Sequence, residues 1–327
     1  MHVCSLFPHM SELFARPDRP PIPPQIRVRI VTTALPSSVI TPLCSPLHAH
    51  FLTIRLSRSY RKNKPSDLTT DEIVSSVAAL FPRLHVLVIG PGLSRDTLML
   101  DCAKGVIGKA REQDMPIVID ADGLFLIQSH PEVIRNYRKA VLTPNVVEFK
   151  RLCEHILPQN TQNSKFKSED IATRLSQALG GVTIVQKGHE DLIANDEQVF
   201  VCDADGGLKR VGGQGDILSG AIATFLAWGK AYEENVWKHD FNIRSADIPI
   251  LASYAGCSLL RETARSAYAR HGRAVLTSDM IGEIGAAFTR VFGDVVDACI
   301  YCVGFRGWSV THLDSLACYL GALANKL

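Results

Sequence analysis

The chain has 327 residues, of which 46% are hydrophobic and 21% are charged, and its formal net charge is +2. This composition is typical of a globular protein with one large or two ordinary domains, and the small net charge argues against a nucleic-acid or anionic-membrane partner. No apolar stretch approaches the roughly 20 residues that span a bilayer. The nine cysteines are scattered along the chain and odd in number, which argues against a disulfide framework and favours a reducing compartment such as the cytoplasm.

The first 60 residues differ from the rest of the chain. Nine of the 17 prolines lie within residues 1–50, and residues 16–24 are too rich in proline for a helix or a central strand. The segment also has few acids against several arginines, a weak indication of a mitochondrial transit segment. We expect an atypical, poorly ordered segment over residues 1–60, with strands at 26–33 and 50–56.

From Thr69 onward the chain alternates between strand and helix patterns. Short apolar runs predict strands at residues 85–90, 116–120, 140–143 and 182–187, and a hairpin at 191–202. Longer patterns predict helices at residues 70–81, 95–113, 146–156, 168–179, 246–271 and 278–292. A further helix is predicted directly after the glycine-rich turn at 211–220. This alternation implies an α/β layered fold with a mainly parallel sheet. We expect one domain over residues 61–294 and an atypical C-terminal extension over residues 295–327, which shows no clear period.

Polar residues follow four predicted strands at their carboxyl ends, where open parallel sheets bind ligands. Asp120 and Asp122 follow the second of these strands; they either support the backbone, which we favour, or hold Mg²⁺ directly or through water. Asn145 and Glu148 have the spacing of a capping box, and they are also placed to reach a substrate and a metal. Lys187 is either an ordinary surface lysine or, as Gly188 after it favours, a residue that lies close to a phosphate.

The run V-G-G-Q-G-D-I-L-S-G at residues 211–220 leads into an apolar helix. Glycines allow tight turns, and the free N–H groups and dipole of a helix start favour an anion. Asp216 is placed there to take a proton from a hydroxyl that attacks a phosphate. The pattern predicts ATP-dependent phosphoryl transfer, with an ordinary helix start and an acidic first turn as the alternative. Walker, dinucleotide-binding, protein-kinase and Ser-His-Asp patterns are absent from the sequence.

Five motifs occur in the order V-I-G-P-G-L, P-I-V-I-D-A-D-G-L, L-T-P-N-x-x-E-F-x-R-L, Q-K-G-x-x-D and G-G-Q-G-D-x-L-S-G. Together they cover residues from about 70 to 294, and the set resembles the ATP-dependent (S)-NAD(P)H-hydrate dehydratases of the ribokinase-like superfamily. The resemblance implies a ribokinase-like layered sandwich and repair of hydrated NADH or NADPH (NADHX or NADPHX). ATP and Mg²⁺ would be required, ADP and phosphate would be released, and a homo-oligomer is implied by analogy.

The resemblance also implies a role for each matching residue. Asp216 would be the catalytic base, and the turn Gly212–Gly215 would form the anion hole. ATP would be lined by Lys187, Gly188, His189, Glu190, Asp191, Gly206, Gly207, Leu208, Lys209, Arg210, Val211, Gly212, Gly213, Gln214 and Gly215. The hydrated dinucleotide would be lined by Gly92, Asn145, Val146, Val147, Glu148, Phe149, Lys150, Arg151 and Asp216. The resemblance assigns no metal ligand, and Glu148, through water, is the candidate that the residues themselves offer.

The N-terminal segment departs from the family pattern. Members begin with a strand that ends in a G-G-S-like turn and have a Y-T-G-A-P-like motif, and residues 1–60 contain neither. We therefore expect the first strands of the sheet and part of the substrate cleft to be missing or replaced. Both ends of the chain would then be altered by splicing, a frame change or a faulty gene prediction. The alternatives are a small-molecule hydroxyl kinase, a non-catalytic remnant that binds nucleotide or a partner subunit, and a structural domain without a site.

Overall fold

The computed structural model describes residues 69–158, 169–236 and 243–293 with their side chains, and the backbone of Ser168 and of two further strands at 26–32 and 49–55. The strands form one eight-stranded sheet in the order β2-β1-β3-β4-β5-β6-β7-β8. Neighbours from β2 to β6 pair in parallel, whereas β7 is antiparallel to both β6 and β8. The strands are β1 (Ile26–Thr32), β2 (Ala49–Arg55), β3 (Val86–Ile89), β4 (Ile117–Ile119), β5 (Ala140–Leu142), β6 (Thr183–Gln186), β7 (Asp191–Ala194) and β8 (Val199–Cys202).

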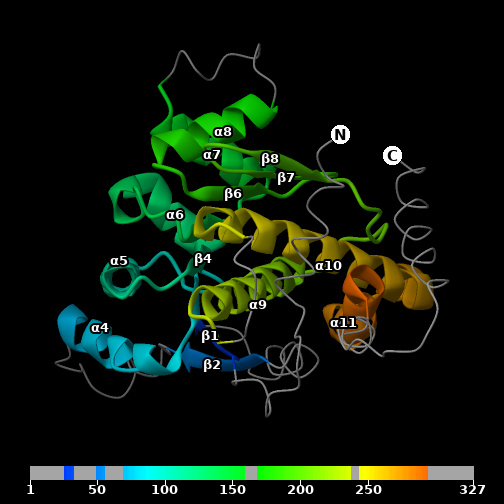
Figure 1. The fold of residues 1–327 in the computed structure, drawn as a ribbon, viewed down its shortest axis with the longest axis horizontal. Helices are drawn as coiled ribbons and strands as arrows, with labels where there is room; N and C mark the ends of the chain where they lie inside the picture. Colours follow the sequence, from blue (N-terminus) through cyan, green and yellow to red (C-terminus); the bar gives the residue numbers. More distant parts are fainter. Residues whose placement is uncertain (1–25, 33–48, 56–68, 159–167, 237–242, 294–327) are drawn as a thin grey trace, which may run out of the picture.

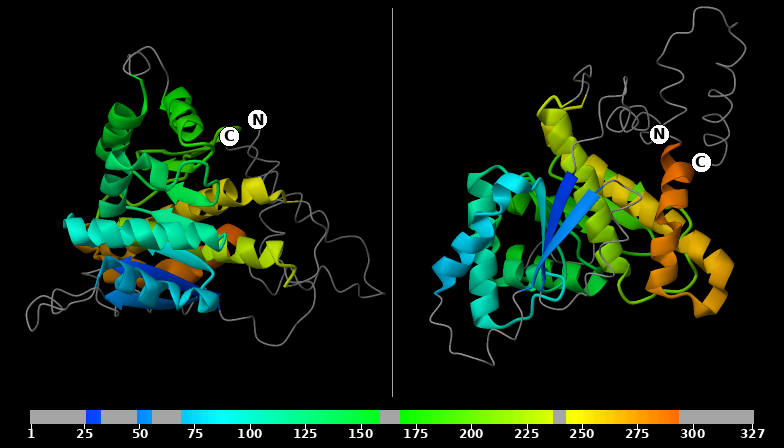
Figure 2. Two further views of the ribbon diagram at one scale, coloured as in Figure 1. Left: turned by 90° about the vertical axis from the view of Figure 1, so that its left-hand side faces the viewer. Right: turned by 90° about the horizontal axis from the view of Figure 1, so that it is seen from below.

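Helices cover both faces of the sheet (Figures 1 and 2). One layer contains α4 (Thr70–Ala78), α5 (Thr97–Glu112), α6 (Asp122–Ser129), α7 (Val146–Ile156) and α8 (Ser168–Ala178). The other contains α9 (Gln214–Glu233), α10 (Ile248–His271) and α11 (Thr277–Phe292). Short 3-10 turns are η2 (Phe81–Arg83), η3 (Pro131–Val133), η5 (Ser245–Asp247) and η6 (Gly272–Ala274). Within the described ranges, no helix combines the length and apolar character needed to cross a membrane.

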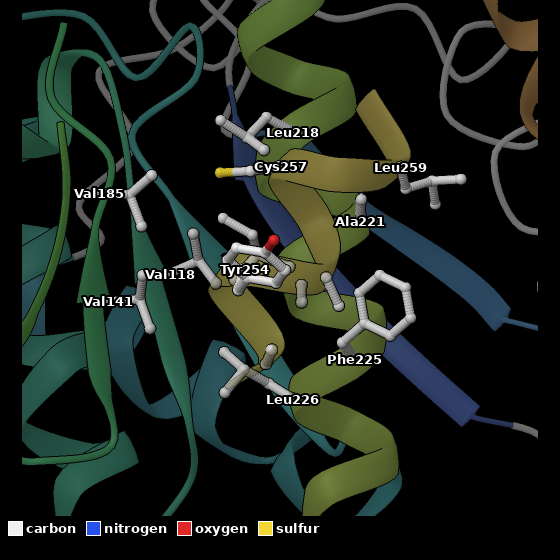
Figure 3. Close-up of a cluster of buried hydrophobic side chains, with 14 of the residues drawn as sticks. Val118, Val141, Val185, Leu218, Ala221, Phe225, Leu226, Tyr254, Cys257 and Leu259 are labelled. Atoms are coloured by element: carbon white, nitrogen blue, oxygen red, sulfur yellow. The ribbon is translucent and has the colours of Figure 1, made fainter. Parts of the chain in front are cut away.

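The core has two halves, one on each face of the sheet, because successive strand residues point to opposite faces. On β3, Val86 and Val88 pack toward α9–α11, whereas Leu87 and Ile89 pack toward α4–α8. Figure 3 shows the first half, in which valines of β4, β5 and β6 meet apolar side chains of α9 and α10. Continuous apolar strands are expected in a sheet that is buried on both faces.

The predicted elements are confirmed with small changes at their ends. The helix at residues 146–156 has the predicted bounds, and the hairpin forms as β7 and β8. The helix predicted to reach Phe81 stops at Ala78, because a 3-10 turn containing Pro82 follows. The helix after the glycine-rich turn continues to Glu233.

The two strands predicted in the N-terminal segment are also confirmed, as β1 and β2. They fill the edge of the sheet next to β3, where the sequence predicts missing or replaced strands. The other residues of the N-terminal segment and the extension at 295–327 lie outside the described residues.

Candidate active site

The polar residues predicted at the strand ends meet at the carboxyl edge of β4, β5 and β6. Asp120 follows β4, and Lys187 follows β6. Asn145, two residues after Thr143, pairs with Lys187 as an isolated parallel bridge, and the Lys187 N–H donates to the Pro144 carbonyl at 2.9 Å. Pairing of β5 with β6 thus continues into the site and brings Asn145 beside Lys187.

An ion pair between a buried Asp120 and a partly buried Lys187 lies at the centre of this edge. Asp120 is only 3% exposed; its Oδ1 accepts hydrogen bonds from Lys187 Nζ at 2.9 Å and from the Ala121 N–H at 2.8 Å. Its Oδ2 accepts a hydrogen bond from Ser219 Oγ on α9 at 2.7 Å. A Cβ added to Gly215 would lie 3.4 Å from Asp120 Oδ2 and 3.7 Å from Lys187 Nζ. The first turn of α9 therefore packs directly on this ion pair.

Asp216 lies in the first turn of α9, beside the ion pair. Burial, in the first place, and the negative charge of Asp120, in the second, raise the pKa of the Asp216 carboxyl from 3.8 to about 6, while Lys187 lowers it. The carboxylate is therefore ionised at neutral pH, yet it is a much better proton acceptor than an ordinary aspartate. These are the properties of a general base.

The start of α9 has no side-chain cap. Gly213 occupies the N-cap position with φ at +92°, a left-handed conformation that favours glycine. The Gly212 carbonyl accepts a hydrogen bond from Thr277 Oγ1 at the start of α11. Lys209 Nζ donates to the carbonyls of Arg273 and Val275 at 2.7 and 3.1 Å. These tethers hold the glycine-rich turn against the α10–α11 connection, and the helix start is left able to receive an anion.

A pocket of about 650 Å³ lies beside this turn, a volume that suits a nucleotide-sized ligand. Its walls include most of the residues predicted to line ATP: Lys187, Gly188, His189, Asp191, Gly206, Gly207, Leu208, Arg210, Val211, Gln214 and Gly215. The predicted residues Glu190, Lys209, Gly212 and Gly213 are not part of its lining.

Further wall residues were not predicted: Asp203, Ala204, Asp205, Leu218, Leu260, Arg261 and Ala264. Asn145, predicted for the dinucleotide, also lines the pocket. Three of the missed residues, Leu260, Arg261 and Ala264, lie on α10 within about one helical turn of one another. This spacing is typical of one face of a helix, but no local sequence signal predicts that this face covers the pocket.

The residues predicted to contact the dinucleotide are divided between surface and core. Asn145 and Glu148 form the expected capping box of α7. Val146 and Val147, each 57% exposed, lie on the surface beside it, whereas Phe149 packs in the core. Lys150 and Arg151 are exposed, and Gly92 lies in the turn after β3 with φ at +64°.

Asp122 supports the turn that contains Gly92. Its carboxylate accepts hydrogen bonds from the Ser94 N–H at 3.0 Å and from Arg95 Nε at 3.2 Å. The Arg95 guanidinium also lies 4.6 Å from the ring centre of Phe125. These contacts match the supporting role favoured for Asp122, because they hold the loop after β3 against the start of α6.

A protein family described as NAD(P)H-hydrate dehydratase matches residues 41–285 of this chain. The match begins before the five motifs and includes β2. A relative from Phaeosphaeria nodorum, named ATP-dependent (S)-NAD(P)H-hydrate dehydratase, is 42% identical over 71% of this chain and 71% of its own length. A relative of the same name from Mus musculus is 43% identical over 69% of this chain. The chain spans 63% of the mouse relative's length, which is less than two thirds.

Solved structures show the fold. A ribokinase-like superfamily protein from Enterococcus faecalis matches with a TM-score of 0.61 and 20% identity, covering 87% of this chain and 95% of that one. A hydroxyethylthiazole kinase from Pyrococcus horikoshii matches with a TM-score of 0.57 and 14% identity, covering 90% and 95%. The predicted ribokinase-like sandwich is thereby confirmed.

Proposed function

This chain belongs to the NAD(P)H-hydrate dehydratase family, and we propose that it restores hydrated NADH and NADPH by ATP-dependent dehydration. The hydrate carries a hydroxyl on its nicotinamide ring. ATP transfers its γ-phosphoryl group to that hydroxyl oxygen, and phosphate then leaves as a neighbouring ring proton is lost, which restores the double bond. One turnover converts hydrate and ATP into NAD(P)H, ADP, phosphate and a proton.

The observation that carries this proposal is the position of Asp216 beside an uncapped helix start. In the phosphorylation step, Asp216 accepts the proton of the attacking hydroxyl. Backbone N–H groups of the turn Gly212–Gly215 face the transferring phosphoryl group and stabilise its charge. Lys187 lies next to both and supplies a positive charge, although Asp120 neutralises part of it. The site thus combines a base with an anion hole.

The adjacent pocket is proposed as the ATP site. Its volume of about 650 Å³ and its position next to the start of α9 allow the phosphates to reach the anion hole. The pocket is lined by backbone at Gly206 and Gly207 and by apolar side chains such as Leu260. The dinucleotide would then bind on the other side of Asp216, toward Gly92 and the start of α7.

Few oxygen atoms of this site are available to contact Mg²⁺. No group of three or more potential metal ligands occurs within the part of the chain that the structure describes. Both oxygens of Asp120 accept hydrogen bonds, whereas among the described residues Glu148 accepts only at Oε2, from the Asn145 N–H at 2.8 Å. We therefore assign the Mg²⁺ contact to Glu148, directly or through water, together with phosphate oxygens. Bound Mg²⁺ would neutralise charge on the phosphates of ATP.

A reducing compartment is part of the proposal. Four cysteines among the described residues, Cys102, Cys153, Cys202 and Cys257, are buried, and the scattered, odd-numbered cysteines of the chain are those expected of a cytoplasmic or mitochondrial protein. Assembly as a homo-oligomer is likewise proposed, by analogy with the family.

The test is the recovery of NADH absorbance after purified protein is mixed with hydrated NADH, ATP and Mg²⁺. We expect ATP-dependent recovery in the wild type and a loss of about 10²- to 10⁴-fold in Asp216→Asn, the range for removal of a general base. The matched control is Asp101→Asn, which removes a surface carboxylate paired with Lys104 and should leave the rate unchanged.

Other results would point to the other candidate functions. Accumulation of a stable phosphate ester on a small alcohol, without dehydration, would indicate a hydroxyl kinase. Folded protein that binds ATP but turns over neither substrate would indicate a non-catalytic nucleotide-binding protein.

A further inference from the structure

Arg261 on α10 lines the pocket, and it is largely buried. Its side chain is 11% exposed, and its Nε lies 2.7 Å from Oδ2 of Asp191, whose side chain is 9% exposed. Asp191 is the first residue of β7. A buried pair of opposite charges therefore forms part of the wall of the proposed ATP site.

The pair joins three separate segments of that wall. The second oxygen of Asp191, Oδ1, accepts the Gly188 N–H at 3.0 Å. The second arm of Arg261, Nη1, donates to the Ala204 carbonyl at 2.9 Å. The turn after β6, the loop after β8 and α10 are thus connected through two side chains. Asp191, predicted to line ATP, has both carboxylate oxygens engaged in this connection.

The packing of the loop against α10 provides independent support. A Cβ added to Gly207 would lie 2.6 Å from the Ala264 carbonyl oxygen, so the loop backbone lies against the helix one turn beyond Arg261. A Cβ added to Gly206 would lie 3.9 Å from Cγ of Arg261. The loop is thus held at its start by a hydrogen bond from Arg261 and in its middle by close backbone packing.

We propose that Arg261 is a positioning residue for ATP. Its side chain holds both loops of the nucleotide pocket in place and neutralises the charge of Asp191. This inference rests on the proposed function, because it takes the pocket to be the ATP site. Arginine suits the role, since its planar group donates in two directions at once. Without it, the negative charge of Asp191 would be left unpaired in a pocket that receives a polyanion.

The first test compares Arg261→Met with wild type by steady-state kinetics and by calorimetric titration with ATP. We expect KM and Kd for ATP to rise by about tenfold or more, as for loss of a charged hydrogen bond. We expect kcat to change by less than about threefold and KM for the hydrate to stay unchanged, because Asp216 lies outside the connection. The matched control is Arg265→Met on the same helix, whose 54% exposed side chain pairs with Glu262.

Two further variants separate charge from folding. Arg261→Lys should have an intermediate Kd, because one ammonium can pair with Asp191 but cannot reproduce the fork to Ala204. The double variant Arg261→Met with Asp191→Asn should recover part of the ATP affinity, because the uncompensated charge is removed.

Unchanged ATP affinity in folded Arg261→Met, or no recovery in the double variant, would overturn the proposal. If Arg261→Met does not fold, the lysine and double variants decide by the same titration. A wild type that binds ATP without dehydrating the hydrate would contradict the proposed function. The role of Arg261 could still be measured, because calorimetry of ATP binding needs no turnover. A wild type that binds no ATP would overturn both.

Discussion

Helices α7 and α9 begin at the same edge of the sheet, but their first turns differ. At α7, Oδ1 of Asn145 accepts the N–H groups of Val147 and Glu148 at 3.0 Å each, and the Glu148 carboxylate accepts the Asn145 N–H. At α9, the N-cap is Gly213, which has no side chain to accept a hydrogen bond. One helix start is satisfied by its own side chains, whereas the other is left for a ligand.

The difference teaches how a single sheet edge can be divided between two tasks. A capped helix start has its N–H groups satisfied, so it presents side chains rather than free N–H groups to a ligand. A bare helix start keeps its N–H groups and its dipole for an anion. The ion pair of Asp120 and Lys187 lies between the two starts and supports both, through Gly215 on one side and Asn145 on the other.

The largest expected effect comes from adding a side chain at the bare start. Gly213→Ala places a Cβ at φ +92°, about 3 Å from Cγ2 of Thr277, so the turn must shift. We expect kcat to fall by about 10²- to 10³-fold, the range for loss of an anion-hole donor. The control is Gly108→Ala on α5, where a Cβ meets nothing within 4 Å. Equal kinetics in the two variants would contradict the assignment of the turn.

The next effect is a pH dependence of the rate. Because the pKa of Asp216 is raised to about 6, kcat should fall as the pH drops below that value, by up to about tenfold per pH unit. Asp120→Asn removes the second cause of the shift and should move the inflection of the pH–rate profile to lower pH. A profile that is flat between pH 5 and about pH 7 would argue against Asp216 as the base.

The same pKa shift affects stability in the opposite direction. A carboxyl whose pKa is higher in the folded than in the unfolded state binds more protons when folded. The Asp216 contribution to the free energy of unfolding therefore falls as the pH rises from 3.8 to about 6. Denaturant titrations of wild type and Asp216→Asn across this window should show that the wild type loses stability relative to the variant.

The smallest effect is expected at the capped start. Asn145→Ala removes two hydrogen bonds at α7 and should lower the free energy of unfolding by about 1 kcal/mol. Thr69→Ala breaks a second capping box, at α4 and away from the site, and serves as the matched control. Both variants should lower Tm, but only Asn145→Ala should also raise the KM for the hydrate. A KM change in both, or in neither, would show that Asn145 acts only as a cap.

Local sequence signals were sufficient for most of the fold. The capping box at Asn145 and Glu148 was predicted because its hydrogen bonds join residues three positions apart. Strands such as β3 were predicted because apolar runs of that length are buried on both faces of a sheet. The motif around Asp216 was predictable for the same reason, since a glycine-rich turn and the helix that follows it are adjacent in the chain.

The site as a whole depends on contacts between distant residues. Asp120 meets Lys187 across 67 positions and Ser219 across 99, and Arg261 meets Asp191 across 70. The sequence by itself determined the elements, the motif at Asp216 and the family, because these depend on neighbours in the chain. Only the tertiary structure decided which helix covers the pocket and how the charges pair, because such pairing depends on how α9 and α10 cross the sheet.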